Sequence, residues 1–309
     1  PVLGLHAASS HTVAVELDTG GVPTRFEAGV VVTEALVGLP PIEVLAHDPA
    51  AMEPGLLVFT LEQDLGRGWI LALDEQLHVV YGLRRIVEDL RLYEGTWFAG
   101  SEDRVVRWDL FGRELQRWPT TGEGNLHHEA FPLPDGGVLS LEHTLLYVPD
   151  YPTDETLTDT APTTVLTQII QRFDADGNIV ESISLGDLLD PQHVGYLSLG
   201  EYPDWTHANS VVPWGDDAYL VSVRHLDVVI CVERSGTLRW MLGDPAGWQE
   251  PWRSLFLEPR GEVVWPRHAH ALEVLPEGVV GMFDNGNHGG TPYAPAPEDY
   301  VEVSRGVAF

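Results

Sequence analysis

The sequence HALEVLPEG at residues 270–278 has two earlier counterparts in the chain. HEAFPLPDG occupies residues 128–136, and HANSVVPWG occupies residues 207–215. All three fit the pattern His-x5-Pro-x-Gly, and their histidines lie 79 (207 − 128) and 63 (270 − 207) positions apart. These intervals are too uneven for a tight solenoid, but they suit propeller blades that carry loops of different length. The pattern therefore predicts a repeated β unit with a histidine at its start.

Short apolar runs and turns surround this pattern from about Gly68 onward. Turns that contain Asp separate runs rich in Val, Ile, Leu and aromatic residues at residues 68–83, 96–118 and 167–185. Such segments are typical of β-hairpins, and no long amphipathic helix is predicted between them. We therefore expect an all-β protein of the six-bladed β-propeller type, because the irregular repeat favours a propeller over a sandwich.

We expect two parts along the chain. Residues 1–65 lack the blade pattern and predict a small, sandwich-like N-terminal β-rich segment, whereas residues 66–309 predict the β-propeller. The sequence begins with Pro1 and stops at Phe309 within an apparent strand, so we expect the last blade to be incomplete. The acidic, Thr-rich tract at residues 151–164 predicts an exposed loop inserted within a blade.

The charge of the chain limits its partners. Its 309 residues include 17 basic and 47 acidic side chains, for a formal net charge of −30, and every basic residue is Arg. A nucleic acid partner is not expected, because phosphates demand a basic surface, and the sequence holds no signal-like or membrane-spanning segment. A homo-oligomer stays open. Any anion site must be locally positive.

The single cysteine, Cys231, excludes an internal disulfide bond. It lies in the apolar run VVICV, which predicts a buried strand residue rather than a nucleophile.

Equivalent positions on successive blades of a propeller converge, because the innermost strands line one central channel. The pattern makes His128, His207 and His270 equivalent. We expect Asn209 to share a strand face with His207, two residues earlier, and Arg224 on the next strand to point the same way. This set of donors suits a tetrahedral oxyanion, with one neutral imidazole left as a nucleophile or base.

Several of these residues lie in motifs of a known family. The chain resembles the bacterial arylsulfate sulfotransferases at DWTHANSV (residues 204–211), SVRHLD (222–227), RWMLG (239–243), the late FDNG (283–286) and a terminal Ser-Arg pair. Members of that family are six-bladed propellers that do not use a nucleotide sulfate donor. The resemblance is strongest over residues 204–305 and extends upstream through LHHEAF.

The resemblance implies a sulfotransferase with ping-pong kinetics. In the family, a histidine attacks the sulfur of an aryl sulfate, the phenol leaves, and a second phenol takes the sulfuryl group from the sulfohistidine. The nucleophile corresponds to His270, while His207 and Asn209 fall on the THAN motif and Arg224 falls on the SxRH motif. The implied partners are an aryl sulfate donor and a phenolic acceptor. No cofactor or metal ion is implied, and the family suggests a periplasmic or extracellular location.

Two places in the chain leave alternatives open. The family has Gln before its nucleophile, whereas this chain has Ala269, with His268 one position further back. His268 therefore either replaces the lost hydrogen bond in substrate binding or is itself reactive. On the first strand of the site, the pattern selects His128 as a catalytic residue, and His127 stays open as a substrate-binding residue.

The residue types alone allow two other functions. Three converging histidines can bind Zn²⁺ and leave a fourth position open for water, as in a metal-dependent propeller hydrolase or lactonase. The permanent positive charge of Arg224 next to a dication disfavours this alternative. The remaining alternative is a non-catalytic binding propeller, in which the histidines only fill the channel.

Overall fold

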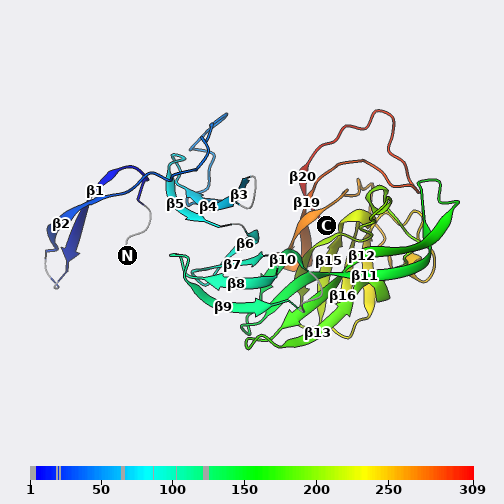
Figure 1. Cartoon of the computed structure of the whole chain (residues 1–309). Coiled ribbons are helices and arrows are strands. Elements are labelled where there is room, and N and C mark those ends of the chain that lie inside the picture. The colour runs from blue at the N-terminus through cyan, green and yellow to red at the C-terminus, as the bar shows by residue number, and fades with distance from the viewer. Residues whose placement is uncertain are drawn as a thin grey trace. The chain divides into compact units, whose positions relative to one another are not determined.

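The computed structural model describes residues 5–309 except 19, 21, 64–66, 86, 102 and 121–124. Within these ranges the chain is all-β, with six sheets and only short 3-10 turns as helical elements (Figure 1). The chain divides into two compact units, Pro1–Leu90 and Arg91–Phe309. The prediction of an all-β protein of propeller type with a small N-terminal β-rich segment is confirmed.

The N-terminal unit contains a two-stranded and a three-stranded sheet. Their strands are β1 (Ser10–Leu17) and β2 (Thr24–Val32), then β3 (Leu57–Gln63), β4 (Arg67–Leu73) and β5 (Val79–Arg84). The predicted domain boundary between residues 65 and 66 stays a prediction. In the structure, β3 and β4 on either side of that boundary pair along their whole length.

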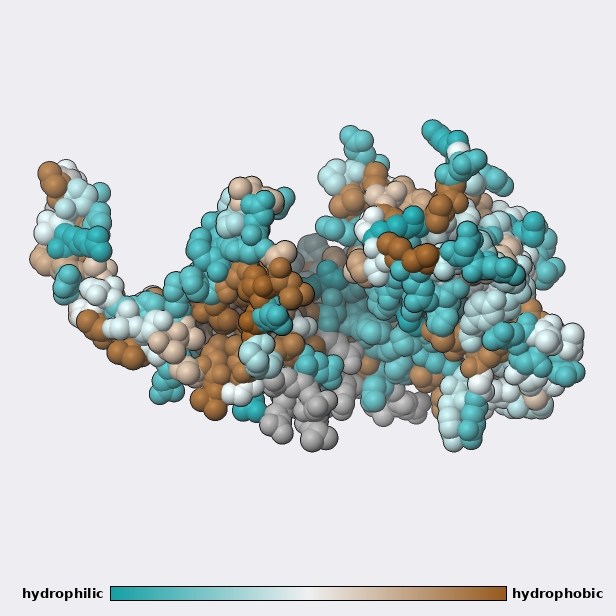
Figure 2. All heavy atoms as spheres, turned by 90° about the horizontal axis from the view of Figure 1, so that it is seen from above, coloured by the Kyte–Doolittle hydropathy of each residue, from teal (hydrophilic) through white to brown (hydrophobic). Residues whose placement is uncertain are grey.

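The apolar side chains of the N-terminal unit are buried on β4 but exposed on β2. Trp69, Leu71 and Leu73 alternate along β4 and form a small core with neighbours such as Leu36, because side chains two residues apart share one strand face. By contrast, every residue of β2 is exposed. Hydrophobic side chains are accordingly visible on the surface of this unit, toward the left of Figure 2.

Four sheets make up most of the unit Arg91–Phe309, and in each of them strands that are consecutive in sequence are neighbours. The strands are β6 (Glu88–Tyr93), β7 (Thr96–Ser101), β8 (Arg104–Trp108) and β9 (Glu114–Pro119); β10 (Leu126–Pro132), β11 (Val138–Pro152), β12 (Thr160–Phe173) and β13 (Ile179–Ser184); β14 (Ala208–Trp214), β15 (Ala218–Val223), β16 (Val228–Glu233) and β17 (Leu238–Gly243); and β18 (His270–Leu275), β19 (Val279–Asp284) and β20 (Arg305–Ala308). Such meanders are the blades of a propeller.

The first strands of three successive blades contact one another. β10 contacts β14, and β14 contacts β18. Ser210 of β14 joins all three, since its Oγ donates to Glu129 Oε2 of β10 at 2.7 Å and accepts from the backbone N–H of Leu272 of β18 at 3.0 Å. The three copies of the His-x5-Pro-x-Gly pattern therefore lie on neighbouring strands.

The three predicted hairpin segments are confirmed, and their Asp residues shape the turns. In each turn, Oδ1 of Asp74, Asp109 or Asp174 accepts two backbone N–H groups from residues two and four positions later. This Asx-turn geometry supplies hydrogen bonds that the backbone cannot form within the turn. The turns therefore connect β4 to β5, β8 to β9 and β12 to β13.

The prediction of an exposed loop at residues 151–164 is wrong for both ends of this tract. β11 and β12 continue through them as one long hairpin, in which Tyr151 pairs with Ala161. Tyr151 is buried, and its hydroxyl donates to the backbone oxygen of Ser198 at 2.8 Å. The buried side chain of Tyr151 therefore holds the hairpin, near its tip, against the segment that contains Ser198.

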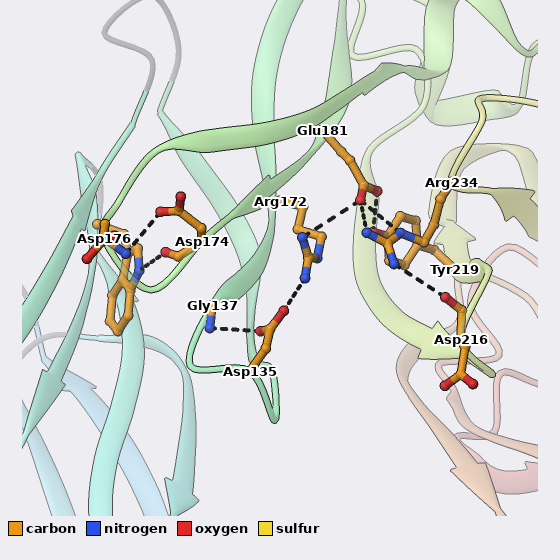
Figure 3. A network of polar contacts seen from close by, with 10 residues as sticks. Asp135, Gly137, Arg172, Asp174, Asp176, Glu181, Asp216, Tyr219 and Arg234 are labelled. Atoms are coloured by element: carbon orange, nitrogen blue, oxygen red, sulfur yellow. Dashed lines mark hydrogen bonds and ion pairs between the residues drawn. The ribbon is translucent and has the colours of Figure 1, made fainter.

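A set of charged side chains joins the blade β10–β13 to the blade β14–β17, and we call it the blade junction network (Figure 3). Arg172 of β12 forms ion pairs with Asp135 and with Glu181 of β13. Glu181 also pairs with Arg234, and it accepts a hydrogen bond from the hydroxyl of Tyr219 at 2.6 Å. Glu181 is therefore one of the residues through which the two blades share polar contacts.

Cys231 lies on β16, where the run from Val228 to Val232 is fully buried, as predicted. Burial raises the pKa of its thiol to about 11, so Cys231 is a packing residue. Among the residues that the structure describes, no helix has the length and apolar character needed to cross a membrane.

Candidate active site

Histidines from the starts of β10, β14 and β18 meet in the unit Arg91–Phe309. His128 Nε2 lies 3.3 Å from His207 Nε2, and the ring centroids of His128 and His270 are 5.8 Å apart. The structure thus brings together the three residues that the repeated pattern makes equivalent.

Irregular backbone orients these histidines. The pairing register of β10, β14 and β18 shifts near the start of each strand. His128 and His207 have left-handed φ angles of 57° and 42°, and Ala271, which follows His270, has 53°. Non-glycine residues rarely adopt this conformation, and bulges and strained backbone are concentrated at functional sites, where they redirect side chains.

Asp204, the first residue of the motif DWTHANSV, holds His207. The Nδ1–H group of His207 donates to Asp204 Oδ2, and Nε2 on the other side of the ring faces His128. Burial acts to raise the pKa of Asp204, but the hydrogen bond from His207 outweighs it and keeps this pKa below its usual value. An anionic Asp204 therefore fixes the tautomer and the orientation of His207, as an Asp does for the histidine of a catalytic triad.

Arg224 is positioned by its neighbour His225. The Nδ1–H group of His225 donates to the backbone oxygen of Asp204 at 2.6 Å, and its Nε2 accepts from Arg224 Nη1 at 2.7 Å. The ring of His225 also stacks on the ring of His207, with centroids 4.5 Å apart. Since burial lowers the pKa of His225 to about 3, this imidazole is neutral, and its Nε2 can accept a hydrogen bond from the guanidinium group of Arg224.

One ring nitrogen of His270, Nδ1, is hydrogen-bonded to the protein, and the other, Nε2, is available. Its Nδ1 lies 2.9 Å from the backbone oxygen of His268 and 2.9 Å from Oδ1 of Asn285. Because both partners are acceptors, the ring proton must reside on Nδ1, and Nε2 keeps its lone pair. Burial lowers the pKa of His270, and the charge of Arg224 adds to this effect. The ring is therefore neutral near pH 7.

His268 reaches the site through its backbone rather than its ring. Its carbonyl oxygen accepts from His270, and its backbone N–H donates to Asp227 Oδ1 at 2.6 Å. The ring itself is buried and contacts Asn287 Oδ1 through Nδ1 at 3.0 Å. This geometry agrees with a supporting hydrogen bond to the candidate nucleophile more than with a reactive His268.

Asn209 joins two of the strands that carry the site. Its side-chain Nδ2 donates to the backbone oxygen of Ala269 at 2.9 Å, next to a second bond from Ser222 Oγ at 2.9 Å. Asn209 is buried, so its carboxamide fixes the residue before His270. The role of Asn209 in substrate binding stays a prediction.

Of the adjacent pair on β10, His128 has the contacts expected of a site residue. Its ring lies near both His207 and His270. His127 is more deeply buried and packs against His143, with ring centroids 4.1 Å apart. Burial lowers the pKa of both residues, strongly for His127 and to about 4 for His128.

Two sets of side chains in this region have the spacing of metal ligands. Donor atoms lie within 4.8 Å of one another in His127–His128–His207 and in Asp204–His207–His225. The first set differs from the predicted zinc trio, because it contains His127 in place of His270.

The site also contains side chains that sequence reasoning missed. Asp204 and His225 stand inside the quoted motifs DWTHANSV and SVRHLD, and Asn285 stands inside FDNG. Their motif membership was the available signal. Their roles depend on contacts that the spacing of residues in sequence does not show, such as the bond from His270 to Asn285 across the pair β18–β19.

The blade-like sheets and the histidine cluster beside Arg224 define a protein of propeller type with a polar site suited to an oxyanion. The profile of the Arylsulfotransferase (ASST) family matches residues 43–309, and the chain belongs to this family. It is similar to arylsulfate sulfotransferase AssT of Escherichia coli O6:H1 strain CFT073, with 23% identity over 62% of this chain and 40% of that protein. The chain thus spans less than half of that relative's length.

Two solved structures show weaker likeness. One is a protein of unknown function from Bacteroides caccae, with a TM-score of 0.45 and 12% identity over 82% of this chain and 73% of that chain. The other is a streptogramin B lyase, with a TM-score of 0.35 and 10% identity over 80% of this chain and 89% of that chain.

Proposed function

We propose that the protein moves a sulfuryl group from an aryl sulfate to a phenolic acceptor by a ping-pong mechanism, with His270 as the nucleophile and without a nucleotide donor. The observation that carries this proposal is the environment of His270. Two acceptors hold the proton on Nδ1, and Nε2 is left with its lone pair, while burial and the charge of Arg224 lower the pKa of the ring. Membership of the arylsulfotransferase family supports the same chemistry.

In the first half-reaction, Nε2 of His270 attacks the sulfur atom of the donor. A nitrogen–sulfur bond forms while the bond from sulfur to the aryl oxygen breaks, and the electron pair leaves with the phenolate. The imidazole ring gains positive charge in this step. The Nδ1–H bonds to the oxygens of His268 and Asn285 stabilise that charge.

The other polar groups bind the sulfuryl oxygens. Arg224 supplies a permanent positive charge, and His128 and Asn209 supply directed hydrogen bonds, with His127 and His268 supporting them. His207 does not donate to the sulfuryl oxygens, because its N–H is bonded to Asp204. A preorganised donor of this kind contributes about 3 kcal/mol when its bond strengthens in the transition state. This local positive charge also offsets the repulsion of an anionic donor by the acidic chain.

In the second half-reaction, His207 is the base that accepts the proton of the incoming phenol. Asp204 keeps the His207 proton on Nδ1, so Nε2 can take the phenolic proton. The resulting phenolate attacks the sulfur atom, the nitrogen–sulfur bond breaks, and His270 regains its neutral form. His207 then returns the proton to solvent.

Intact-protein mass spectrometry tests the covalent step. The protein is mixed with 4-nitrophenyl sulfate without an acceptor, and nitrophenolate release is followed in parallel. We expect one sulfuryl adduct and a stoichiometric burst of nitrophenolate. Addition of phenol should remove the adduct.

Three variants identify the nucleophile. His270→Ala should give no adduct, His268→Ala should still give one, and the control His47→Ala, in the N-terminal unit, should behave as the parent protein. An adduct that persists in His270→Ala, or the absence of both adduct and nitrophenolate from folded parent protein, would overturn the proposal.

A metal-dependent hydrolase is the second candidate function, and the spacing of the donor atoms of His127, His128 and His207 favours it. This candidate requires that bound Zn²⁺ activate a water molecule. It predicts hydrolysis that depends on added zinc, is lost on chelation and produces no sulfuryl adduct. Both assays on the same preparation therefore separate the two functions.

A further inference from the structure

A second histidine cluster lies in the N-terminal unit Pro1–Leu90, away from every residue of the candidate active site in sequence. His6 precedes β1, Asp74 directly follows β4, and His78 directly precedes β5. The Nε2 atom of His6 lies 3.0 Å from Asp74 Oδ2, and Nδ1 of His78 lies 3.4 Å from the same oxygen. The donor atoms of all three side chains lie within 4.8 Å of one another.

We propose that His6, Asp74 and His78 form a binding site for a divalent transition-metal ion, with Zn²⁺ as the best-suited ion. Two imidazole nitrogens and one carboxylate oxygen are common ligands of Zn²⁺, at bond lengths of about 2.0–2.2 Å. In a tetrahedral site these bonds place neighbouring ligand atoms about 3.3–3.6 Å apart. The observed separations of 3.0 and 3.4 Å are close to this value.

The carboxylate is already oriented for this role. Asp74 Oδ1 accepts the backbone N–H groups of Gln76 at 3.0 Å and of His78 at 2.9 Å. These bonds fix the carboxyl group and direct Oδ2 toward both imidazoles. Metal binding would therefore use the one oxygen that the turn does not need.

The backbone of His6 is fixed as well. Its carbonyl oxygen accepts from Thr33 Oγ1 at 2.5 Å and from Nε2 of His11 at 3.0 Å. These contacts hold the residue that must approach Asp74 from 68 positions away in sequence. Less conformational entropy is then lost when the ligand set binds an ion.

The turn itself does not require histidine. The equivalent turns at Asp109 and Asp174 have the same pair of bonds to Oδ1, and Arg113 and Asn178 stand where His78 stands here. A turn function explains Asp74 but neither imidazole. The side chains of His6 and His78 are about half exposed (45% and 55%), so an ion held by three protein ligands has a face open for water.

Isothermal titration of the full chain with Zn²⁺ at pH 7 tests this site. The variants His6→Ala and His78→Asn remove one ligand each, and the second places at residue 78 the side chain that the turn at Asp174 carries. We expect both variants to lose one equivalent of zinc, or to bind it at least about tenfold more weakly. Any zinc bound by the histidines near Asp204 is bound equally by the parent and by both variants. It therefore does not affect the difference in zinc stoichiometry between them.

His47→Ala is the matched control. His47 contacts the backbone oxygen of Glu75 in the same turn at 2.8 Å but is not part of the ligand set, so zinc binding should be unchanged. Equal zinc binding by the parent, His6→Ala and His78→Asn would overturn the proposal, as would equal losses in His47→Ala.

Discussion

At the residue scale, His207 and His270 each use Nδ1 for a hydrogen bond to the protein and leave Nε2 for chemistry. The partner differs, because His207 faces the carboxylate of Asp204 whereas His270 faces only neutral oxygens. A carboxylate favours a histidine that takes up a proton, and neutral acceptors favour one that stays neutral until it forms a bond. This contrast is the basis for the roles proposed above, with His207 as the base and His270 as the nucleophile.

The substitution Asp204→Asn tests this division. An Asn side chain can present Nδ2 to His207, which would reverse the tautomer and leave Nε2 protonated. We expect the acceptor-dependent decay of the sulfuryl adduct to slow by about 100-fold or more, which is the usual contribution of a general base. Formation of the adduct should change much less, and rapid-quench mass spectrometry measures both rates.

Asp216→Asn, on an exposed turn, serves as the control for that substitution and should leave both rates unchanged. Equal slowing of the two half-reactions in Asp204→Asn would mean that Asp204 supports the whole site and not a base. Unchanged decay would remove His207 from the proposed role.

At the scale of elements, the blade junction network makes a testable contribution to stability. Glu181 receives bonds from Tyr219 and Arg234 in a setting where its side chain is 16% exposed. We expect Glu181→Gln to lower the free energy of unfolding by about 1.5–3 kcal/mol, the range for hydrogen bonds to a charged group. Urea unfolding followed by circular dichroism measures the change.

Glu114→Gln is a surface control for that substitution. Glu114 pairs with Arg117, and loss of such an exposed pair should cost less than about 1 kcal/mol. Burial acts to raise the pKa of Glu181, but its bonds to Arg234 and Tyr219 prevail and lower it. The stabilisation by Glu181 should therefore persist at neutral pH and disappear as the pH falls through this lowered pKa. The free energies of unfolding of the parent and of Glu181→Gln should therefore converge under strongly acidic conditions. If the difference between them stays as large there as at neutral pH, this account is contradicted.

The elements also show what could be predicted from sequence. The Asp-containing turns predicted the hairpins because an Asx turn is a local interaction of about four residues. The repeated pattern predicted that His128, His207 and His270 would be close, because it marks the same position on neighbouring strands. Asp204 and Asn285 could not be assigned, since their bonds depend on bulged registers and on which ring nitrogen faces them. The hairpin within residues 151–164 was missed because a single buried residue, Tyr151, outweighs the polar composition of the tract.

At the scale of the whole molecule, the buried histidines make stability depend on pH. Burial lowers the pKa of His268 and of His128 to about 4 and that of His225 to about 3, against about 6.5 in an unfolded chain. Between these values the unfolded state binds more protons, so stability should fall as the pH is lowered from about 6.5 toward 4. Each such histidine contributes about 2 kcal/mol to the loss between pH 7 and 5.

The variant His268→Asn isolates one of these contributions. Its free energy of unfolding should fall between pH 7 and 5 by about 2 kcal/mol less than that of the parent protein, whatever the cost of the substitution at pH 7. Urea titrations at the two pH values give this difference. An unchanged pH dependence would mean that His268 is protonated in the folded protein.

The net charge of −30 on 309 residues gives a last prediction, which rests on the proposed function. The aryl sulfate donor is an anion and the phenolic acceptor is neutral at pH 7, and ping-pong kinetics give a separate kcat/KM for each. Salt shortens the Debye length from about 30 Å at 0.01 M to about 8 Å at 0.15 M. We therefore expect kcat/KM for the donor to rise severalfold over this range while kcat/KM for the acceptor stays constant, with sodium and choline chloride giving the same result. An equal rise for both substrates would indicate a general effect of salt on folding, and a fall for the donor alone would mean that the local charge of Arg224 governs its approach.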